Sequence, residues 1–149
     1  MAGNQVPDTS AFILAIRELQ NNPGGRPRLL RSAFRGRLYV SAVVAAELYA
    51  GTRSVDDKRF IDEIVVTAKR ARRYLTPTGA DWEQAGQMIN HMRDKGIIDP
   101  RPHLADLLIV LAAARVQGAV LTKNVHHMTM WAEAARRSGW KVTVEKYGP

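Results

Sequence analysis

The sequence contains no cysteine, and this absence excludes three kinds of chemistry. Disulfide scaffolds, zinc sites with thiolate ligands and enzymes with a cysteine nucleophile all need that residue. The absence is compatible with a reducing cytosol, where disulfides do not persist. We therefore expect a cytoplasmic protein whose chemistry rests on oxygen and nitrogen side chains.

Long apolar runs and familiar ligand-binding motifs are also missing. No run approaches the ~20 apolar residues that a membrane-spanning helix needs, so no membrane association is expected. Residues 1–7 form a short polar segment that lacks the pattern of a signal peptide. No GxSxG, Walker A or GxGxxG motif occurs, so the sequence does not predict a serine-hydrolase elbow, a P-loop or a dinucleotide site.

Acidic residues are outnumbered, with 14 Asp and Glu against 22 Lys and Arg, and the net charge is +8. A positive balance favours a polyanion such as nucleic acid, or an acidic protein partner. A solvated basic face is the alternative interpretation of any one cluster. The clusters are Arg26, Arg28, Arg31, Arg35 and Arg37, then Lys69, Arg70, Arg72 and Arg73, and finally Arg136 and Arg137.

The 149 residues are long enough for a single domain spanning 1–149, and their pattern alternates between strands and helices. Strands are predicted over 5–8, 37–41, 73–76, 119–122 and 141–145. Helices are predicted over 10–20, 42–50, 55–72, 80–95, 103–117 and 128–138, with a second basic helix after Pro27. This alternation predicts a three-layer α/β/α sandwich around a four- to five-stranded parallel sheet.

Two of these helices carry an acid in otherwise apolar surroundings. Glu47 is the only charge in AVVAAELYA (42–50), and Asp106 is the only acid in HLADLLIVLAAA (103–114). Helices this apolar are expected to be buried, where an isolated carboxylate is costly and needs a partner. The partner could be an Arg or Lys in a buried ion pair, or a metal ion shared by both acids. Asp106 could also stabilise the first turn of its helix through the helix dipole.

Asp8 is a third acid, at the junction of the first strand and the first helix. Asp8, Thr9 or Ser10 could each serve as the N-cap of that helix. In an open parallel sheet, however, residues that follow a strand point into the crevice where ligands bind. Asp8, Glu47 and Asp106 are therefore candidates for a site that binds Mg²⁺ or Mn²⁺ through oxygen ligands and acts on a phosphodiester.

The histidines offer a weaker alternative. His126 and His127 are adjacent, so in a helix their side chains point ~100° apart and do not form the i, i+4 zinc pair. His91 and His103 are isolated in the sequence. A zinc site is therefore not favoured.

Three blocks, in this order and spacing, resemble PIN-domain ribonucleases. PDTSAFILAI resembles their first strand and helix, and LYVSAVVAAELYAGTR resembles the second block, in which a helix carries Glu before a glycine. HLADLLIVLAAARVQGAVLTKNVHHM resembles the third block, in which an Asp-bearing helix precedes a short strand and a Thr-x-Asn/Asp motif. Within the family, the similarity is greatest to the VapC-like toxins of bacterial toxin–antitoxin pairs.

The resemblance implies a Mg²⁺- or Mn²⁺-dependent endoribonuclease that has an antitoxin partner and forms a homodimer. It implies that Asp8, Glu47 and Asp106 are the catalytic and metal-binding acids. Asn124 would be a further catalytic residue, with Thr122 and Ser10 in support. We expect Arg53 and Arg93 to contact RNA phosphates.

The chain departs from the family pattern in one respect. Many members carry another Asp in or just after the Thr-x-Asn/Asp motif, whereas this chain reads TKNVHHM, with no acid. A site with three acids should hold one ion better than two. The departure keeps two alternatives open, namely a PIN fold that binds RNA or protein without cleavage, and a PIN nuclease of RNA maturation or DNA processing.

Overall fold

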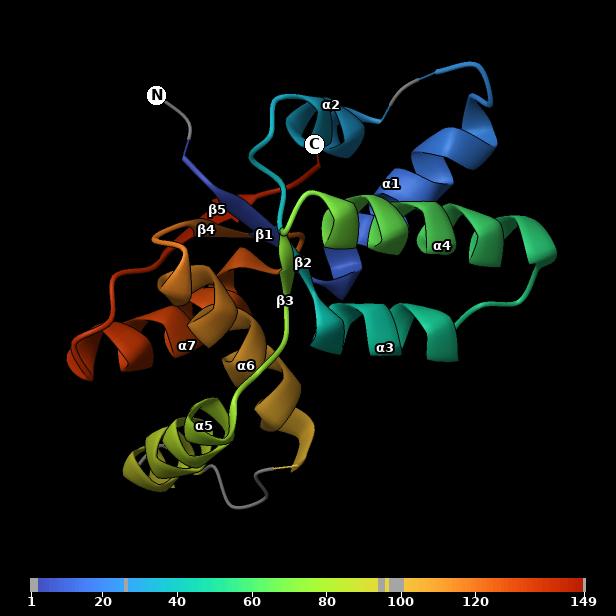
Figure 1. Cartoon of the computed structure of the whole chain (residues 1–149). Helices are drawn as coiled ribbons and strands as arrows, with labels where there is room; N and C mark the ends of the chain where they lie inside the picture. The colour runs from blue at the N-terminus through green and yellow to red at the C-terminus, as the bar shows by residue number, and fades with distance from the viewer. Residues whose placement is uncertain (1–2, 26, 94–95, 97–100, 149) are drawn as a thin grey trace.

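The computed structural model describes residues 3–25, 27–93, 96 and 101–148, and Figure 1 follows the chain through its helices and short strands. The elements in chain order are β1 (Gln5–Pro7), α1 (Thr9–Asn21), α2 (Arg28–Phe34), β2 (Val40–Ser41), α3 (Ala42–Ala50), α4 (Val55–Arg70), β3 (Tyr74–Leu75), α5 (Gly79–His91), α6 (Arg101–Arg115), β4 (Ala119–Thr122), α7 (Val125–Arg137) and β5 (Thr143–Lys146).

All strand pairs are parallel. β4 lies between β1 and β5, and β2 pairs with β3. A bridge between Gln5 and Leu38, with a hydrogen bond from the Tyr39 amide to the Gln5 carbonyl at 2.9 Å, joins the two groups. The strands thus run in the order β3-β2-β1-β4-β5. β1 and β4 are central neighbours at which the direction of winding reverses.

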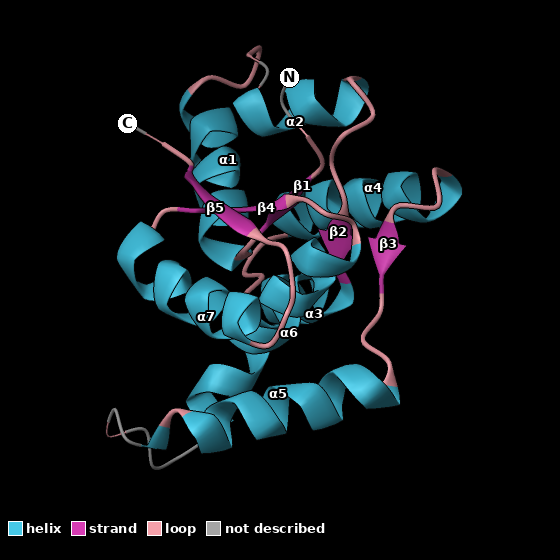
Figure 2. Cartoon of the chain, turned by 90° about the vertical axis from the view of Figure 1, so that its left-hand side faces the viewer, coloured by secondary structure: helices cyan, strands magenta, loops and turns pink. Residues whose placement is uncertain are grey.

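This order explains the layers. Crossovers between parallel strands are almost always right-handed. The chain first proceeds from β1 to β2 and β3 at one edge of the sheet, and then returns to β4 and β5 on the other side of β1. The helices of these two halves therefore lie on opposite faces of the sheet. Figure 2 shows α1, α2 and α4 on one side of the sheet and α5, α6 and α7 on the other. The carboxyl ends of β1 and β4 are the switch point where ligands bind in such sheets.

Local sequence signals set the helix ends. The Ser54 side chain accepts a hydrogen bond from the Asp57 amide at the start of α4, whose last turn carries Lys69 and Arg70. Acidic residues at the start of a helix and basic residues at its end complement the helix dipole. α5 begins with a capping box, in which Thr78 and Asp81 each accept from the other's backbone amide.

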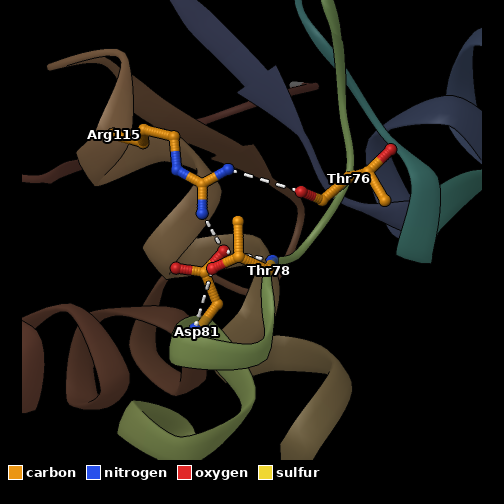
Figure 3. Close-up of polar contacts among 4 residues, drawn as sticks. All are labelled: Thr76, Thr78, Asp81 and Arg115. Carbon is orange, nitrogen blue, oxygen red and sulfur yellow. Dashed lines mark hydrogen bonds and ion pairs between the residues drawn. The ribbon is translucent and has the colours of Figure 1, made fainter.

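Arg115, at the end of α6, fastens the start of α5 to the rest of the molecule. Its guanidinium donates to the Thr76 carbonyl oxygen at 3.3 Å and to the carboxylate of Asp81 (Figure 3). Asp81 therefore completes its helix cap and an ion pair with the same side chain. This clamp connects α6 to the segment between β3 and α5.

The interior is continuous across the described residues. Phe12 from α1, Leu107 and Leu111 from α6 and Trp131 from α7 are among its largest buried side chains. Gly118 is required where α6 turns into β4, because a Cβ there would lie 2.6 Å from the Asn4 carbonyl oxygen. None of the described helices combines the length and the apolarity needed to cross a membrane.

The predicted fold class is confirmed, with differences at several element ends. The strand predicted over 37–41 is reduced to Val40–Ser41, and α5 ends at His91 instead of 95. Part of that predicted extension, residues 94–95, lies outside the described residues, as does Arg26 of the first basic cluster. α6 begins at Arg101, two residues before the predicted start, so Asp106 lies in the second turn. The expected first-turn dipole effect on Asp106 was therefore wrong.

Candidate active site

Asp8 follows β1 directly and is 6% exposed. Its amide donates to the Leu121 carbonyl of β4 at 2.9 Å, which extends the β1–β4 ladder to this residue. Its Oδ1 accepts from the Ala11 amide at 3.1 Å and from the Ser10 hydroxyl at 2.6 Å, so Asp8 is the N-cap of α1. No described residue donates a hydrogen bond to Oδ2. The capping role and a ligand role are thus compatible, because they use different oxygens.

Ser10 and Thr122 connect the two central strands at their carboxyl ends. The only hydroxyl proton of Ser10 goes to Asp8, so Thr122, 3.4 Å away, is the donor in the contact between the two hydroxyls. The Ser10 oxygen also accepts from the Lys123 amide at 3.0 Å, and Thr122 accepts from the Asn124 amide at 3.0 Å. Both residues therefore orient the backbone around Asp8 and Asn124.

Glu47 lies in the last turn of α3, and its Oε1 accepts from the Thr9 hydroxyl at 2.8 Å. Thr9 adjoins Asp8, so this contact brings Glu47 to the end of β1. The expectation that Glu47 is buried was wrong, because its side chain is exposed. The buried face of α3 consists of Val44, Ala45 and Leu48, while its other alanines lie partly or fully in solvent. Alanine is apolar but small enough to be tolerated on either face.

Asp106 projects from α6 and is partly buried, with its side chain 27% exposed. Its Oδ2 lies 2.8 Å from Nε2 of His127 in α7. Neither Asp106, Asp8 nor Glu47 forms an ion pair with an Arg or Lys within the part of the chain that the structure describes. The alternative of buried Arg or Lys pairs therefore has no support there.

His127 contacts Asp106 but is not among the site residues that the sequence predicts. It stands three positions after Asn124, in the first turn of α7, and its ring packs against Trp131 and His103 with centroids 6.4 and 6.5 Å apart. The spacing of the histidines in the sequence bears only on a zinc site, which it does not favour. The available signal was the absence of an acid in TKNVHHM, a place where family members often have one.

Arg53 and Arg93, the two residues expected to bind phosphates, lie in different surroundings. Arg53 lines a groove between α1 and the α3–α4 segment, together with Thr9, Arg17 and Glu47. Arg17, in α1, was not predicted, although it is exposed and faces the same groove. Arg93 follows the end of α5, and no described contact connects it to the candidate site.

Comparisons with known proteins fit this geometry. The family model described as PIN domain matches residues 6–127. The chain belongs to the PIN domain family. The match extends from β1 to His127, so it includes the three candidate acids, the Ser10 and Thr122 hydroxyls and His127. No curated protein sequence matches this PIN protein.

Solved structures share the PIN fold over almost the whole chain. A chain in the crystal structure of VapBC2 from Rickettsia felis bound to a DNA fragment from their promoter is 16% identical, with a TM-score of 0.64 and coverage of 97% of this chain and 98% of that one. A chain in the crystal structure of DNA-bound VapBC from Salmonella typhimurium is 18% identical, with a TM-score of 0.61, and the match covers 98% of this chain and 99% of that one. A chain in the structure of VapBC-1 from nontypeable Haemophilus influenzae is 16% identical, with a TM-score of 0.60, and the match covers 96% of this chain and 97% of that one.

The candidate side chains of this PIN domain would suit a hard divalent cation, because Asp8, Glu47 and Asp106 offer carboxylate oxygens. Among the described residues, no three His, Asp or Glu side chains lie close enough together to form a ready-made cage. Mg²⁺ does not need one, since it keeps several waters and takes one or two carboxylates directly. Asp8, Glu47 and Asp106 fit a hydrated ion of this kind.

Proposed function

We propose that this PIN domain is a Mg²⁺- or Mn²⁺-dependent endoribonuclease and the toxin of a toxin–antitoxin pair. The observation that carries the proposal is the run of contacts along one edge of the sheet. It passes from Glu47 through Thr9 to Asp8, and from Asp8 through Ser10 and Thr122 to the Asn124 backbone. His127, which contacts Asp106, lies in the first turn of α7, one helical turn after Asn124.

In the proposed mechanism, Asp8, Glu47 and Asp106 hold the ion directly or through water. The ion, when bound, lowers the pKa of an attacking water and stabilises negative charge on the scissile phosphate. Ser10 fixes the orientation of the Asp8 carboxylate through its 2.6 Å hydrogen bond. The exposed Asn124 side chain orients water or the phosphate, and Arg53 attracts the RNA backbone.

The toxin role and its partners are part of the same proposal. The solved structures that share the fold bear the name VapBC, and the net charge of +8 favours an acidic partner or RNA. We propose a cognate antitoxin, a homodimeric assembly and a cytoplasmic location. Co-expression with a small protein encoded beside it should relieve growth inhibition caused by this chain alone.

Asp8→Asn tests the catalytic proposal, because asparagine is as good an N-cap as aspartate and the fold should persist. Cleavage of RNA in Mg²⁺ or Mn²⁺ should fall at least about a hundredfold, since even partners in the outer shell of a metal contribute 10–100-fold. Glu83→Gln, at an exposed position on α5, should cut at the wild-type rate. Unchanged cleavage by Asp8→Asn would remove Asp8 from the mechanism.

Thermal melts test the metal site without cleavage. Millimolar Mg²⁺ or Mn²⁺ should raise the Tm of the wild type, because a ligand that binds only the native state stabilises it. Glu47→Gln and Asp106→Asn should lose most of this rise. In EDTA both variants should lie within about 1 kcal/mol of the wild type, since Glu47 is exposed and the Asp106 pair is half-exposed.

A PIN fold that binds RNA without cutting it is the second candidate. The absence of an acid in TKNVHHM favours it, because the site then carries less negative charge. That candidate requires RNA binding by the wild type with no cleavage in Mg²⁺ or Mn²⁺. Cleavage that disappears in EDTA and in Asp8→Asn excludes it.

A further inference from the structure

We propose that His127 is a ligand of the divalent ion and makes this site prefer Mn²⁺ to Mg²⁺. The inference rests on the proposed metal-dependent function and deepens it. It assigns a task to the His127 side chain, which contacts Asp106 and which the catalytic proposal does not use. It also identifies the metal that the chain's own donor atoms select.

The spacing of the two donor atoms is the first argument. Two ligands at right angles around an ion, each about 2.1 Å from it, are separated by about 3.0 Å. Nε2 of His127 and Oδ2 of Asp106 lie 2.8 Å apart. The pair therefore already has the separation of neighbouring ligands, and an ion would lie to one side of the line between the two atoms once the proton they share has left.

The surroundings of His127 hold its ring in this direction. Trp131, fully buried one turn later on α7, meets the imidazole edge-on at 84°. His103, one turn before Asp106 on α6, contacts both the His127 and Trp131 rings. The His127 side chain is nevertheless 46% exposed, so solvent and ions reach it. A ring fixed by aromatic contacts on one side and open on the other suits a ligand.

The chemistry of the donor then sets the metal preference. Mg²⁺ is bound almost entirely by oxygen, whereas imidazole suits transition metals, and affinity for nitrogen rises along the series that begins with Mn²⁺. An imidazole next to Asp106 thus adds more to Mn²⁺ binding than to Mg²⁺ binding. In the neutral tautomer with its proton on Nδ1, His127 presents the Nε2 lone pair to the ion.

Matched variants separate this role from a structural one. His127→Gln keeps an N–H that can donate to Asp106 but removes the imidazole lone pair. His127→Asp replaces nitrogen with a carboxylate. His126→Gln is the control, because His126 is the exposed neighbour and makes no contact with Asp106. Circular dichroism and thermal melts in EDTA should show that all three variants fold.

Calorimetric titration with MnCl₂ and MgCl₂ gives the first measurement. We expect His127→Gln to weaken Mn²⁺ binding about tenfold or more and Mg²⁺ binding less than about threefold. His127→Asp should shift the preference toward Mg²⁺, and His126→Gln should match the wild type. Equal losses for both ions, or no loss, would overturn the assignment of His127 while leaving Asp8 and Asp106 as candidates.

Electron spin echo spectroscopy of bound Mn²⁺ gives the second measurement, because it detects nitrogen coordinated to the ion. The wild type and His126→Gln should show nitrogen modulation, and His127→Gln should lack it. Modulation that persists in His127→Gln, or is absent in the wild type, contradicts the proposal. A wild type that binds neither ion would overturn the metal-dependent function as well, so the two failures are distinguishable.

Discussion

At the scale of single residues, Asp8 shows how one carboxylate can serve both the fold and a reaction site. Oδ1 caps α1 and accepts from Ser10, while Oδ2 accepts nothing from the described residues. The N-cap interpretation is confirmed, and the ligand interpretation stays a prediction with which the cap is compatible. Asp81 likewise has two roles, because its carboxylate caps α5 and pairs with Arg115.

Ser10→Ala tests the hydroxyl network. The change removes one donor from Asp8 and leaves the hydroxyl of fully buried Thr122 without an acceptor. We expect the free energy of unfolding to fall by about 1–3 kcal/mol, the cost of buried polar groups left unpaired, as measured by urea denaturation. Ser138→Ala is the control, because this exposed hydroxyl contacts only the Ala134 carbonyl, and it should change stability by less than about 0.5 kcal/mol. Equal effects of the two substitutions would show that the network contributes nothing particular to stability.

At the scale of helices and strands, the clamp of Arg115 on Asp81 explains why α5 is held at its start. Arg115→Met removes donors to the Thr76 carbonyl and the Asp81 carboxylate, of which the latter is only 13% exposed. We expect a loss of about 1–3 kcal/mol in the free energy of unfolding and faster amide exchange in the first turns of α5. Lys58→Met breaks the exposed Lys58–Asp62 pair and should cost less than about 1 kcal/mol. If amide exchange in α5 is unchanged in Arg115→Met, the clamp does not hold this helix.

The elements that the sequence predicts best are those with a strong local signal. β4, over 119–122, and α3, over 42–50, have the predicted bounds because each is a mainly apolar run with a glycine at one end, Gly118 before β4 and Gly51 after α3. β2 is poorly predicted, because the apolar character of residues 37–41 reports burial and not a continuous ladder with one neighbouring strand. Val40 and Ser41 pair with β3, whereas Leu38 forms an isolated bridge to Gln5 of β1.

The residues of the candidate site also divide into those that the sequence predicts and those that it does not. Asp8, Ser10 and Thr122 are predictable from the rule that side chains meet at the carboxyl ends of neighbouring parallel strands. The Asp106–His127 pair is not, because it depends on the angle at which α6 crosses α7. The exposure of Glu47 could not be predicted either, because an alanine-rich helix has no clear polar face that would indicate which side of the helix is turned to solvent.

At the scale of the whole molecule, the net charge of +8 has a measurable consequence for RNA binding. Arg17 and Arg53 line the groove that contains Glu47, so each should contribute a phosphate contact. Arg17→Ala or Arg53→Ala, made in the Asp8→Asn background to prevent cleavage, should lower the slope of log affinity against log salt by about 0.7 for single-stranded RNA. Arg137→Ala, on α7, should leave the slope unchanged, and fluorescence anisotropy provides the affinities. An unchanged slope in both groove variants would place the RNA elsewhere.

The central position of β1 determines when this molecule becomes complete during its synthesis. Asp8 leaves the ribosome before β4 does, but its amide donates to Leu121, more than a hundred residues later in the chain. Ser10, which donates to the Asp8 carboxylate, is held by Thr122 and Lys123. Long loops of this kind must close before the strands can pair, so β1 has no neighbour on that side until β4 emerges. In a nascent chain the candidate site therefore stays unassembled until residue 124 has left the exit tunnel. The order of translation itself thus delays any activity that needs this site.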